Sequence, residues 1–122
     1  MIISDEDLVR ILSEQRGVCD RFNAAFDPAD LELNMGIAKN FSSGLSPLNG
    51  LRHPATETTS GWYLWAGEEP SQADDFFKAV HGHHLLEWNR AVLKYLALPP
   101  GWRFLIARDY EDVWFDAKLL EV

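Results

Sequence analysis

A run of aromatic residues at 61–67, opened and closed by glycine, is the most distinctive apolar pattern in the chain. In an extended strand Trp62 and Leu64 share one face, because side chains alternate from side to side. Tyr63 and Trp65 then share the other face. The pattern predicts a central strand covered on both sides, with its aromatic rings mainly in the core. A strand that packs on helices on one side and forms an aromatic surface patch on the other fits it as well.

The N-terminal segment shows helical spacing of its apolar residues and predicts a helix within residues 1–27. Ser4 and Asp7 form a capping-box pattern at its start, and Pro28 predicts its end. Cys19 falls on the apolar stripe, where we expect a buried structural thiol rather than a nucleophile.

Shorter patterns follow between this helix and the central strand. Residues 33–39 alternate with period two and predict a strand, and residues 48–53 suit a second, short strand. Serine, glycine and proline are frequent at 41–50, which indicates turns, and the polar residues 54–60 predict a loop into the central strand.

Two helices and a hairpin are predicted after the central strand. The first helix is expected to start near Phe76, and the second to run from about residue 84 to the Pro-Pro-Gly at 99–101. The inner face of the second helix is expected to be formed by Leu85, Trp88, Val92 and Leu96. Residues 102–108 form the clearest strand by composition, and residues 113–116 are expected to return as its hairpin partner.

This order of elements indicates the α+β class. We expect a single domain over residues 1–122, with an antiparallel or mixed β-sheet, helices packed on one side, an N-terminal helix and a C-terminal β-hairpin. The length of 122 residues and the hydrophobic content of 47% suffice for one core.

The chain is acidic, with a formal net charge of −8 from 19 acidic and 11 basic residues. This charge repels phosphate backbones and anionic lipids, so we expect neither nucleic acid nor a membrane as a partner, and a basic protein is favoured. Solubility alone also accounts for an acidic surface. The N-terminus lacks the basic region of a secretory signal, no apolar run suits a bilayer, and the single cysteine excludes an internal disulfide, so we expect a cytoplasmic protein.

The sequence shows no recognised catalytic motif. Its acidic runs are typical of solvated surface, whereas acid–base catalysis needs a pKa shifted by burial, and the nucleophile, phosphate-loop and dinucleotide motifs are absent. His81, His83 and His84, with Glu87 close by, have the chemistry of metal ligands, but their spacing matches no recognised site. We therefore expect neither an enzyme nor a cofactor, and whether these histidines bind a metal stays open.

Acidic residues gather in two connections that are far apart in sequence, one after the central strand and one between the hairpin strands. Each has aromatic residues beside its carboxylates, as tight protein interfaces do. If the two strand ends lie together, the connections form one acidic face for a basic partner. The expected partner-binding residues are Glu68, Glu69, Asp74, Asp75, Asp109, Tyr110, Glu111 and Asp112. Beneath them, as core or rim, we expect Trp62, Trp65, Trp102, Phe104 and Trp114.

Several segments carry motifs that occur together in a known family. They are Met-Gly-Ile-Ala-Lys at 35–39, Ser-Gly-Trp-Tyr-Leu-Trp-Ala-Gly-Glu-Glu at 60–69, Val-Leu-Lys-Tyr-Leu at 92–96, Leu-Pro-Pro-Gly-Trp-Arg-Phe at 98–104 and Tyr-Glu-Asp-Val-Trp-Phe-Asp at 110–116. With them the chain resembles the bacterial immunity protein 33-like family, formerly a domain of unknown function, over about residues 33–119. The loop 47–60 departs from the family pattern, and the N-terminal helix lies outside the resemblance.

The resemblance implies a small cytoplasmic immunity protein of a bacterial toxin system, which neutralises a cognate toxin by binding it and has no enzymatic activity. It carries over no catalytic residues. Two alternatives stay open: a small ligand-binding or hydrolytic domain that uses Trp65 and nearby carboxylates, and a structural domain that homodimerises through a sheet edge. We expect a monomer or a weak homodimer.

Overall fold

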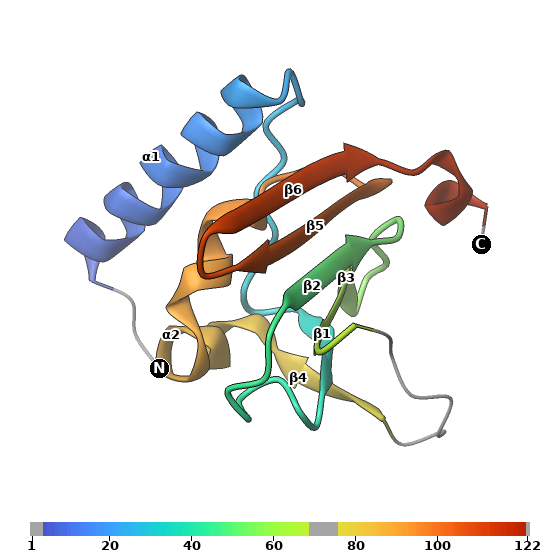
Figure 1. Cartoon of the computed structure of the whole chain (residues 1–122). Helices are drawn as coiled ribbons and strands as arrows, with labels where there is room; N and C mark the ends of the chain where they lie inside the picture. The colour runs from blue at the N-terminus through green and yellow to red at the C-terminus, as the bar shows by residue number, and fades with distance from the viewer. Residues whose placement is uncertain (1–3, 69–75, 122) are drawn as a thin grey trace.

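The computed structural model describes residues 4–68 and 76–121, and within them six strands form one sheet with helices along one of its faces (Figure 1). No helix in these two ranges is long and apolar enough to cross a membrane. In chain order the elements, with η for a 3-10 helix, are α1 (Asp5–Arg21), β1 (Asn34–Ala38), β2 (Leu48–Arg52), β3 (Thr59–Ala66), β4 (Phe77–His81), η1 (Gly82–His84), α2 (Leu85–Trp88), η2 (Arg90–Tyr95), β5 (Trp102–Ala107), β6 (Tyr110–Phe115) and η3 (Ala117–Leu120).

The sheet is mixed, with the strand order β4-β1-β3-β2-β5-β6. Strands β1 and β3 run parallel, and the other neighbouring strands pair antiparallel. The aromatic run of the sequence forms β3, which lies between β1 and β2 and buries Trp62 and Leu64 completely. The predicted α+β class, with an N-terminal helix and a C-terminal hairpin, is therefore confirmed.

The core lies between one face of the sheet and the helices. Trp62 is 0% exposed, its indole N–H donates to the Leu96 carbonyl at 3.3 Å, and its ring centre lies 5.7 Å from that of Phe104. Helix α1 packs against η2 and adds Cys19 and other apolar side chains to this core. The Cys19 thiol is buried as predicted, and burial raises its pKa, so it is a poor nucleophile.

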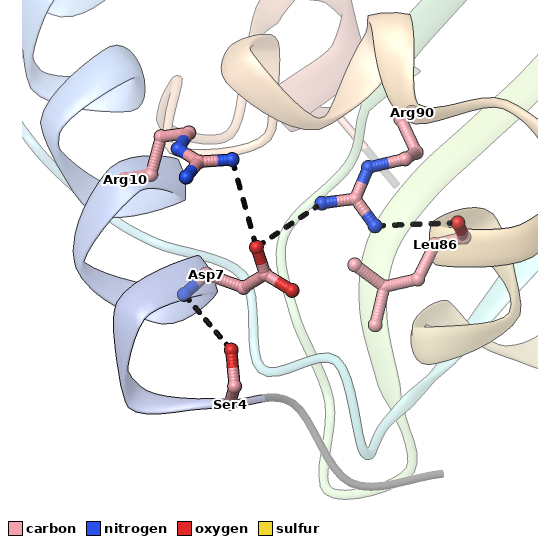
Figure 2. A network of polar contacts seen from close by, with 5 residues as sticks. All are labelled: Ser4, Asp7, Arg10, Leu86 and Arg90. Carbon is pink, nitrogen blue, oxygen red and sulfur yellow. Dashed lines mark hydrogen bonds and ion pairs between the residues drawn. The ribbon is translucent and has the colours of Figure 1, made fainter.

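Helix α1 begins at a cap and is tied to the neighbouring helical segment (Figure 2). The backbone N–H of Asp7 donates to the Ser4 hydroxyl at 3.1 Å, as the capping pattern predicts. The Asp7 carboxylate lies 3.7 Å from the guanidinium of Arg10 and 3.8 Å from that of Arg90. Arg90 also donates to the Leu86 carbonyl at 3.5 Å. Exposed ion pairs contribute little free energy each, so this network mainly orients the start of the helix.

Arg52 is a buried arginine that holds three separate parts of the chain. Its side chain belongs to β2, and the residue is 3% exposed. Its Nε donates to the Ser60 carbonyl at 3.0 Å, and its Nη1 donates to the carbonyls of Asp27 and Leu98, both at 2.8 Å. Burial lowers its pKa, but the guanidinium remains charged at neutral pH.

Of the two helices predicted after the central strand, the first is wrong and the second is confirmed only in part. The helix expected near Phe76 is instead strand β4, because pairing with β1 satisfies its backbone hydrogen bonds. The second helix is interrupted at Asn89, whose extended backbone separates α2 from η2. Trp88 is consequently 44% exposed and not part of an inner stripe. The buried members of that stripe are Leu85, Val92 and Leu96.

Two boundaries also differ from the predictions. Helix α1 ends at Arg21 and not near residue 27, because Asn23 adopts the left-handed conformation with φ of 57°. The hairpin turn contains only Arg108 and Asp109, since the next three acidic or aromatic residues belong to β6. The acidic hairpin connection expected at 109–112 is therefore mostly strand.

Candidate protein-binding face

The pairing register brings Glu68, which follows β3, and the hairpin turn to the same end of the sheet. Ala66 at the end of β3 pairs with Leu48 of β2, and Leu48 pairs with Ile106 of β5. Ile106 pairs in turn with Glu111 of β6, so these four residues form one row. Neighbouring strands lie about 4.8 Å apart, which places the end of β3 about 15 Å from β6. Glu68 and the hairpin turn therefore leave the sheet at one end.

Two asparagines hold the end of β3, where the first acidic connection starts. Asn40 donates to the Ala66 carbonyl at 2.7 Å and accepts from the Ala66 N–H at 3.1 Å. Asn49 is buried and donates to the Gly67 carbonyl at 2.6 Å. Because both sides of the chain are bonded here, the direction in which Glu68 leaves the sheet is well defined.

A groove of about 1020 Å³ opens beside the hairpin turn. It lies between the ends of β5 and β6, the segment that precedes β2, and the α2–η2 segment. Its rim has three large apolar side chains that remain exposed to solvent: Leu45 at 54%, Trp88 at 44% and Tyr110 at 57%. Exposed apolar groups gathered at a concave surface are typical of an interaction site.

The predicted contact residues are distributed inside and outside this groove. The described ones that line it are Asp109, Tyr110 and Glu111. The described ones that do not line it are Glu68 and Asp112. Asp112 follows Glu111 along β6, so side-chain alternation directs it to the opposite face of the sheet. Outside the described residues lie Glu69, Asp74 and Asp75.

Glu111 is bonded on two sides and is not a freely solvated carboxylate. Arg21 donates to its two oxygens at 2.8 and 3.1 Å, the Tyr95 hydroxyl also donates to it, and its side chain is 27% exposed. The hydrogen bonds from Arg21, aided by that from Tyr95, lower the pKa of Glu111 to about 2. Burial, together with the bond to Glu111, raises the pKa of Tyr95. The expectation of a solvated Glu111 is therefore corrected.

The groove carries charges of both signs. Arg21, Lys94 and Arg108 line it beside Asp109 and Glu111. Because Arg21 and Glu111 form an ion pair, their charges largely cancel. The net charge of −8 therefore belongs to the surface as a whole and not to the groove.

The histidine cluster supports Trp88 at the groove rim. The rings of His81 and His83 are 5.5 Å apart, and those of His83 and His84 are 4.5 Å apart. His84 stacks on Trp88 with ring centres 5.2 Å apart. In the part of the chain that the structure describes, no group of three or more His, Cys, Asp or Glu residues has the geometry of a metal site.

Several groove residues were not identified from the sequence. Leu45 lies in the Ser-, Gly- and Pro-rich segment 41–50, and an apolar residue inside such a turn region is the one local signal of an exposed anchor. Trp88 fits an inner helical stripe, so no local signal indicated its exposure. Arg21 and Glu111 are 90 residues apart, and only the folded chain joins them.

A family model described as the Imm33-like domain matches residues 14–116. The chain belongs to the Imm33-like family. The resemblance is thereby confirmed, and the match begins earlier than residue 33, so it includes the second half of α1. All residues named above as lining the groove of this Imm33-like protein lie within the match, and the family name indicates an immunity protein. A search of curated proteins and a search of solved structures found no significant match.

Proposed function

We propose that this Imm33-like protein is a cytoplasmic immunity protein that binds and neutralises a cognate bacterial toxin. Family membership supports this role. In the proposal the toxin contacts the hairpin face, which we define as the apolar groove rim together with the acidic residues at the same end of the sheet. The rim residues are Leu45, Trp88 and Tyr110, and the described acidic residues at this end are Glu68, Asp109 and Asp112. Glu69, Asp74 and Asp75 lie outside the described residues and remain expected contacts from their place in the sequence alone.

The observation that carries this proposal is the convergence of three exposed apolar side chains on one groove. Trp88 and Tyr110 come from separate parts of the chain and are each about half exposed. Tryptophan and tyrosine are the side chains most enriched among residues that dominate binding energy in protein interfaces. A partner that covers them removes a large apolar area from water.

The net negative charge of the protein favours a basic toxin as the partner, but it acts mainly on the rate at which the two proteins meet. The net charge of −8 attracts a basic toxin from a distance and speeds encounter. Lys94 and Arg108 line the groove together with Asp109, so the toxin surface that fits the groove must carry both acidic and basic groups. In this proposal the acidic surface sets the rate of capture, and the apolar rim sets the lifetime of the complex.

The chemistry of the groove favours binding over catalysis. Glu111, with a pKa of about 2, stays ionised at neutral pH, so it is no general acid and only a weak base. Trp65, on which the hydrolytic alternative depends, is 3% exposed and does not line the groove. The small-ligand alternative draws support from the groove's volume, which is close to the upper end of the usual range of roughly 300–1,000 Å³ for ligand sites.

The protein encoded next to this chain is the first toxin candidate, and its binding can be measured by calorimetry after co-purification. Trp88→Ala and Tyr110→Ala should each weaken binding about tenfold or more, because each removes a central apolar anchor. Leu120→Ala is the matched control, since it removes a side chain that is 44% exposed and lies outside the groove. Equal affinity of all three variants would contradict the proposed face.

Association kinetics test the acidic part of the face. Reversing Glu68, Asp109 and Asp112 to lysine should slow capture of a basic toxin, and the effect should grow as salt is lowered. Glu111 is left intact, because its loss also breaks the bonds from Arg21 and Tyr95. An association rate that is unchanged at low salt would argue against electrostatic capture.

Light scattering separates the structural alternative from this proposal. A homodimer that Trp88→Ala dissociates would mean that the groove rim serves self-association. A monomer at micromolar concentration would leave the rim free for another protein.

A further inference from the structure

The charged residues that line the groove of the hairpin face differ in sign from the chain as a whole. The described lining contains three cations and two carboxylates: Arg21, Lys94, Arg108, Asp109 and Glu111. The whole chain, in contrast, has a formal net charge of −8. At physiological salt, exposed charges more than about 8 Å apart are largely screened, so a group inside the groove responds mainly to the lining.

Two of the lining cations have no carboxylate partner. Arg21 and Glu111 form an ion pair at 2.8 Å, and the Tyr95 hydroxyl donates to the same carboxylate, so the charges of this pair largely cancel. Among the described residues, neither Lys94 nor Arg108 forms an ion pair. Arg108 is exposed in the hairpin turn, whereas Lys94 is partly buried. These two cations are therefore available to a partner.

Lys94 lies against the wall of the groove that Tyr95 forms. Its Nζ is 5.4 Å from the centre of the Tyr95 ring, and both residues line the groove. A partly buried ammonium is incompletely hydrated, so a carboxylate that reaches it is bound more strongly than at an open surface. The remaining lining carboxylate, Asp109, is exposed next to Arg108. One carboxylate does not compensate two cations, so the described lining favours one further negative charge.

We propose that the groove binds a segment of the toxin in which an aspartate or glutamate adjoins a large apolar residue. We call these two toxin residues the acidic anchor. The inference rests on the proposed toxin-binding function. The carboxylate of the anchor pairs with Lys94 and Arg108, and its apolar side chain covers the rim formed by Leu45, Trp88 and Tyr110. The three rim side chains are each about half exposed, and a protein segment covers such a broad apolar rim better than a small ligand does.

Charge reversal at the two cations separates the acidic anchor from general attraction. Lys94→Glu and Arg108→Glu make the protein more acidic, so the association rate of a basic toxin should stay unchanged or rise at low salt. Each should nevertheless raise the dissociation rate about tenfold, because it places a negative charge beside the carboxylate of the anchor. Lys118→Glu is the matched control, since Lys118 is exposed and lies outside the groove, and it should leave the dissociation rate unchanged.

Short peptides test the same chemistry without the toxin. Acetyl-glutamyl-tryptophan amide should bind the full chain with a dissociation constant of about 1 mM, and it should shift the Trp88 indole signal in nitrogen–proton NMR. The glutaminyl peptide has the same shape without the charge and should bind about threefold more weakly. The double variant Lys94→Met, Arg108→Gln should bind both peptides equally, and Lys118→Gln should keep the preference for glutamate.

The outcomes distinguish this inference from the proposed function. The acidic anchor is overturned if the glutaminyl peptide binds as tightly as the glutamyl peptide, or if the double variant keeps the preference for glutamate. It is also overturned if charge reversal leaves the dissociation rate of the toxin unchanged while Trp88→Ala raises it, and in that case the proposed function stands. A toxin that does not bind the unmodified protein overturns the proposed function and, with it, the toxin as the source of the segment.

Discussion

At the scale of single residues, the role of a carboxylate depends on the donors around it. Glu111 and Asp112 are neighbours in an acidic run, and the sequence predicts the same solvated surface for both. In the folded chain Arg21 and Tyr95 bond to Glu111, whereas Asp112 is exposed on the other face of the sheet. The donors come from remote parts of the chain, so local patterns contain no sign of them.

Replacing Glu111 by glutamine should reduce the pH dependence of stability. The folded-state pKa of about 2 lies below the usual value of 4.5, so the ionised carboxylate stabilises the fold above about pH 5, and this contribution is lost as the pH falls toward 2. Between these limits we expect the unmodified protein to lose about 1–2 kcal/mol more than Glu111→Gln, less than the full shift implies because solvent reaches the pair. Urea unfolding at several pH values measures this difference.

Asp112→Asn is the control for this experiment, because it removes an exposed carboxylate one residue away. It should keep the pH dependence of the unmodified protein. If Glu111→Gln and the unmodified protein lose stability in parallel, the ion pair with Arg21 contributes nothing to the fold.

Alanine substitutions at two glycines allow the cost of an unfavourable backbone conformation to be measured apart from the cost of a steric clash. Gly61 and Gly44 have φ of 94° and 88°, so alanine at either position pays the left-handed penalty of about 1–2 kcal/mol. At Gly61 an added Cβ also runs into the His53 carbonyl oxygen, whereas nothing lies within 4 Å at Gly44. Gly61→Ala should therefore cost at least about 3 kcal/mol in urea unfolding. Similar losses for both variants would show that the strands around Gly61 adjust easily.

At the scale of elements, strands are predicted from the sequence better than helices. The segments assigned to β1, β3, β5 and β6 carry either period-two alternation or β-branched and aromatic residues, and these signals are local. The prediction of β2 rests on its place between two turn-rich segments. Strand β4 contains Phe77 and Val80, but these also fit a helix that starts after the Ser-Gln-Ala-Asp capping pattern at 71–74, and its pairing with β1 determines its structure. The break at Asn89 is equally non-local, because it places Val92 in the core and Trp88 at the groove.

The two ion pairs that join α1 to other elements, Arg21–Glu111 and Asp7–Arg90, should contribute differently to stability. Arg21 makes a bidentate contact with Glu111, whereas Arg90 approaches Asp7 at only 3.8 Å in an exposed position. Arg21→Ala should cost about 1 kcal/mol, after allowing for its partial exposure, and Arg90→Ala less than about 0.5 kcal/mol. Denaturant unfolding measures both, and Arg10→Ala serves as a second exposed control. The reverse order would mean that the start of α1 anchors the helix.

At the scale of the whole molecule, one helix contributes to two hollows. Arg21 at the end of α1 lines the groove, and Gln15 lines a second hollow of about 370 Å³ between α1 and the chain that follows it. The sequence predicts that the acidic connections lie at strand ends, and the register places those ends together. It does not predict a hollow, because hollows arise where elements from distant parts of the chain fail to fill space. The surrounding surface carries the excess negative charge.

Replacing Trp62, in the core between the sheet and the helices, should reduce the stability of the protein more than replacing Trp114. Its ring is fully buried, so Trp62→Ala should destabilise the protein by about 3–5 kcal/mol. Trp114 is only partly buried and packs against Arg103, so Trp114→Ala should cost about 1 kcal/mol. Thermal unfolding compares the two variants. Equal destabilisation would mean that the outer face of the sheet is as important as the core.

Arg52 has a consequence for the way the molecule opens. Its cation sits where water is scarce, and three stretches of chain supply the oxygens around it. If one stretch moves away, the buried charge loses one of the acceptors that compensate for its burial. Half-open forms are therefore high in energy, and the three stretches separate together or not at all. We therefore expect β2 and the three stretches bonded to it to unfold as one cooperative unit for as long as Arg52 stays buried.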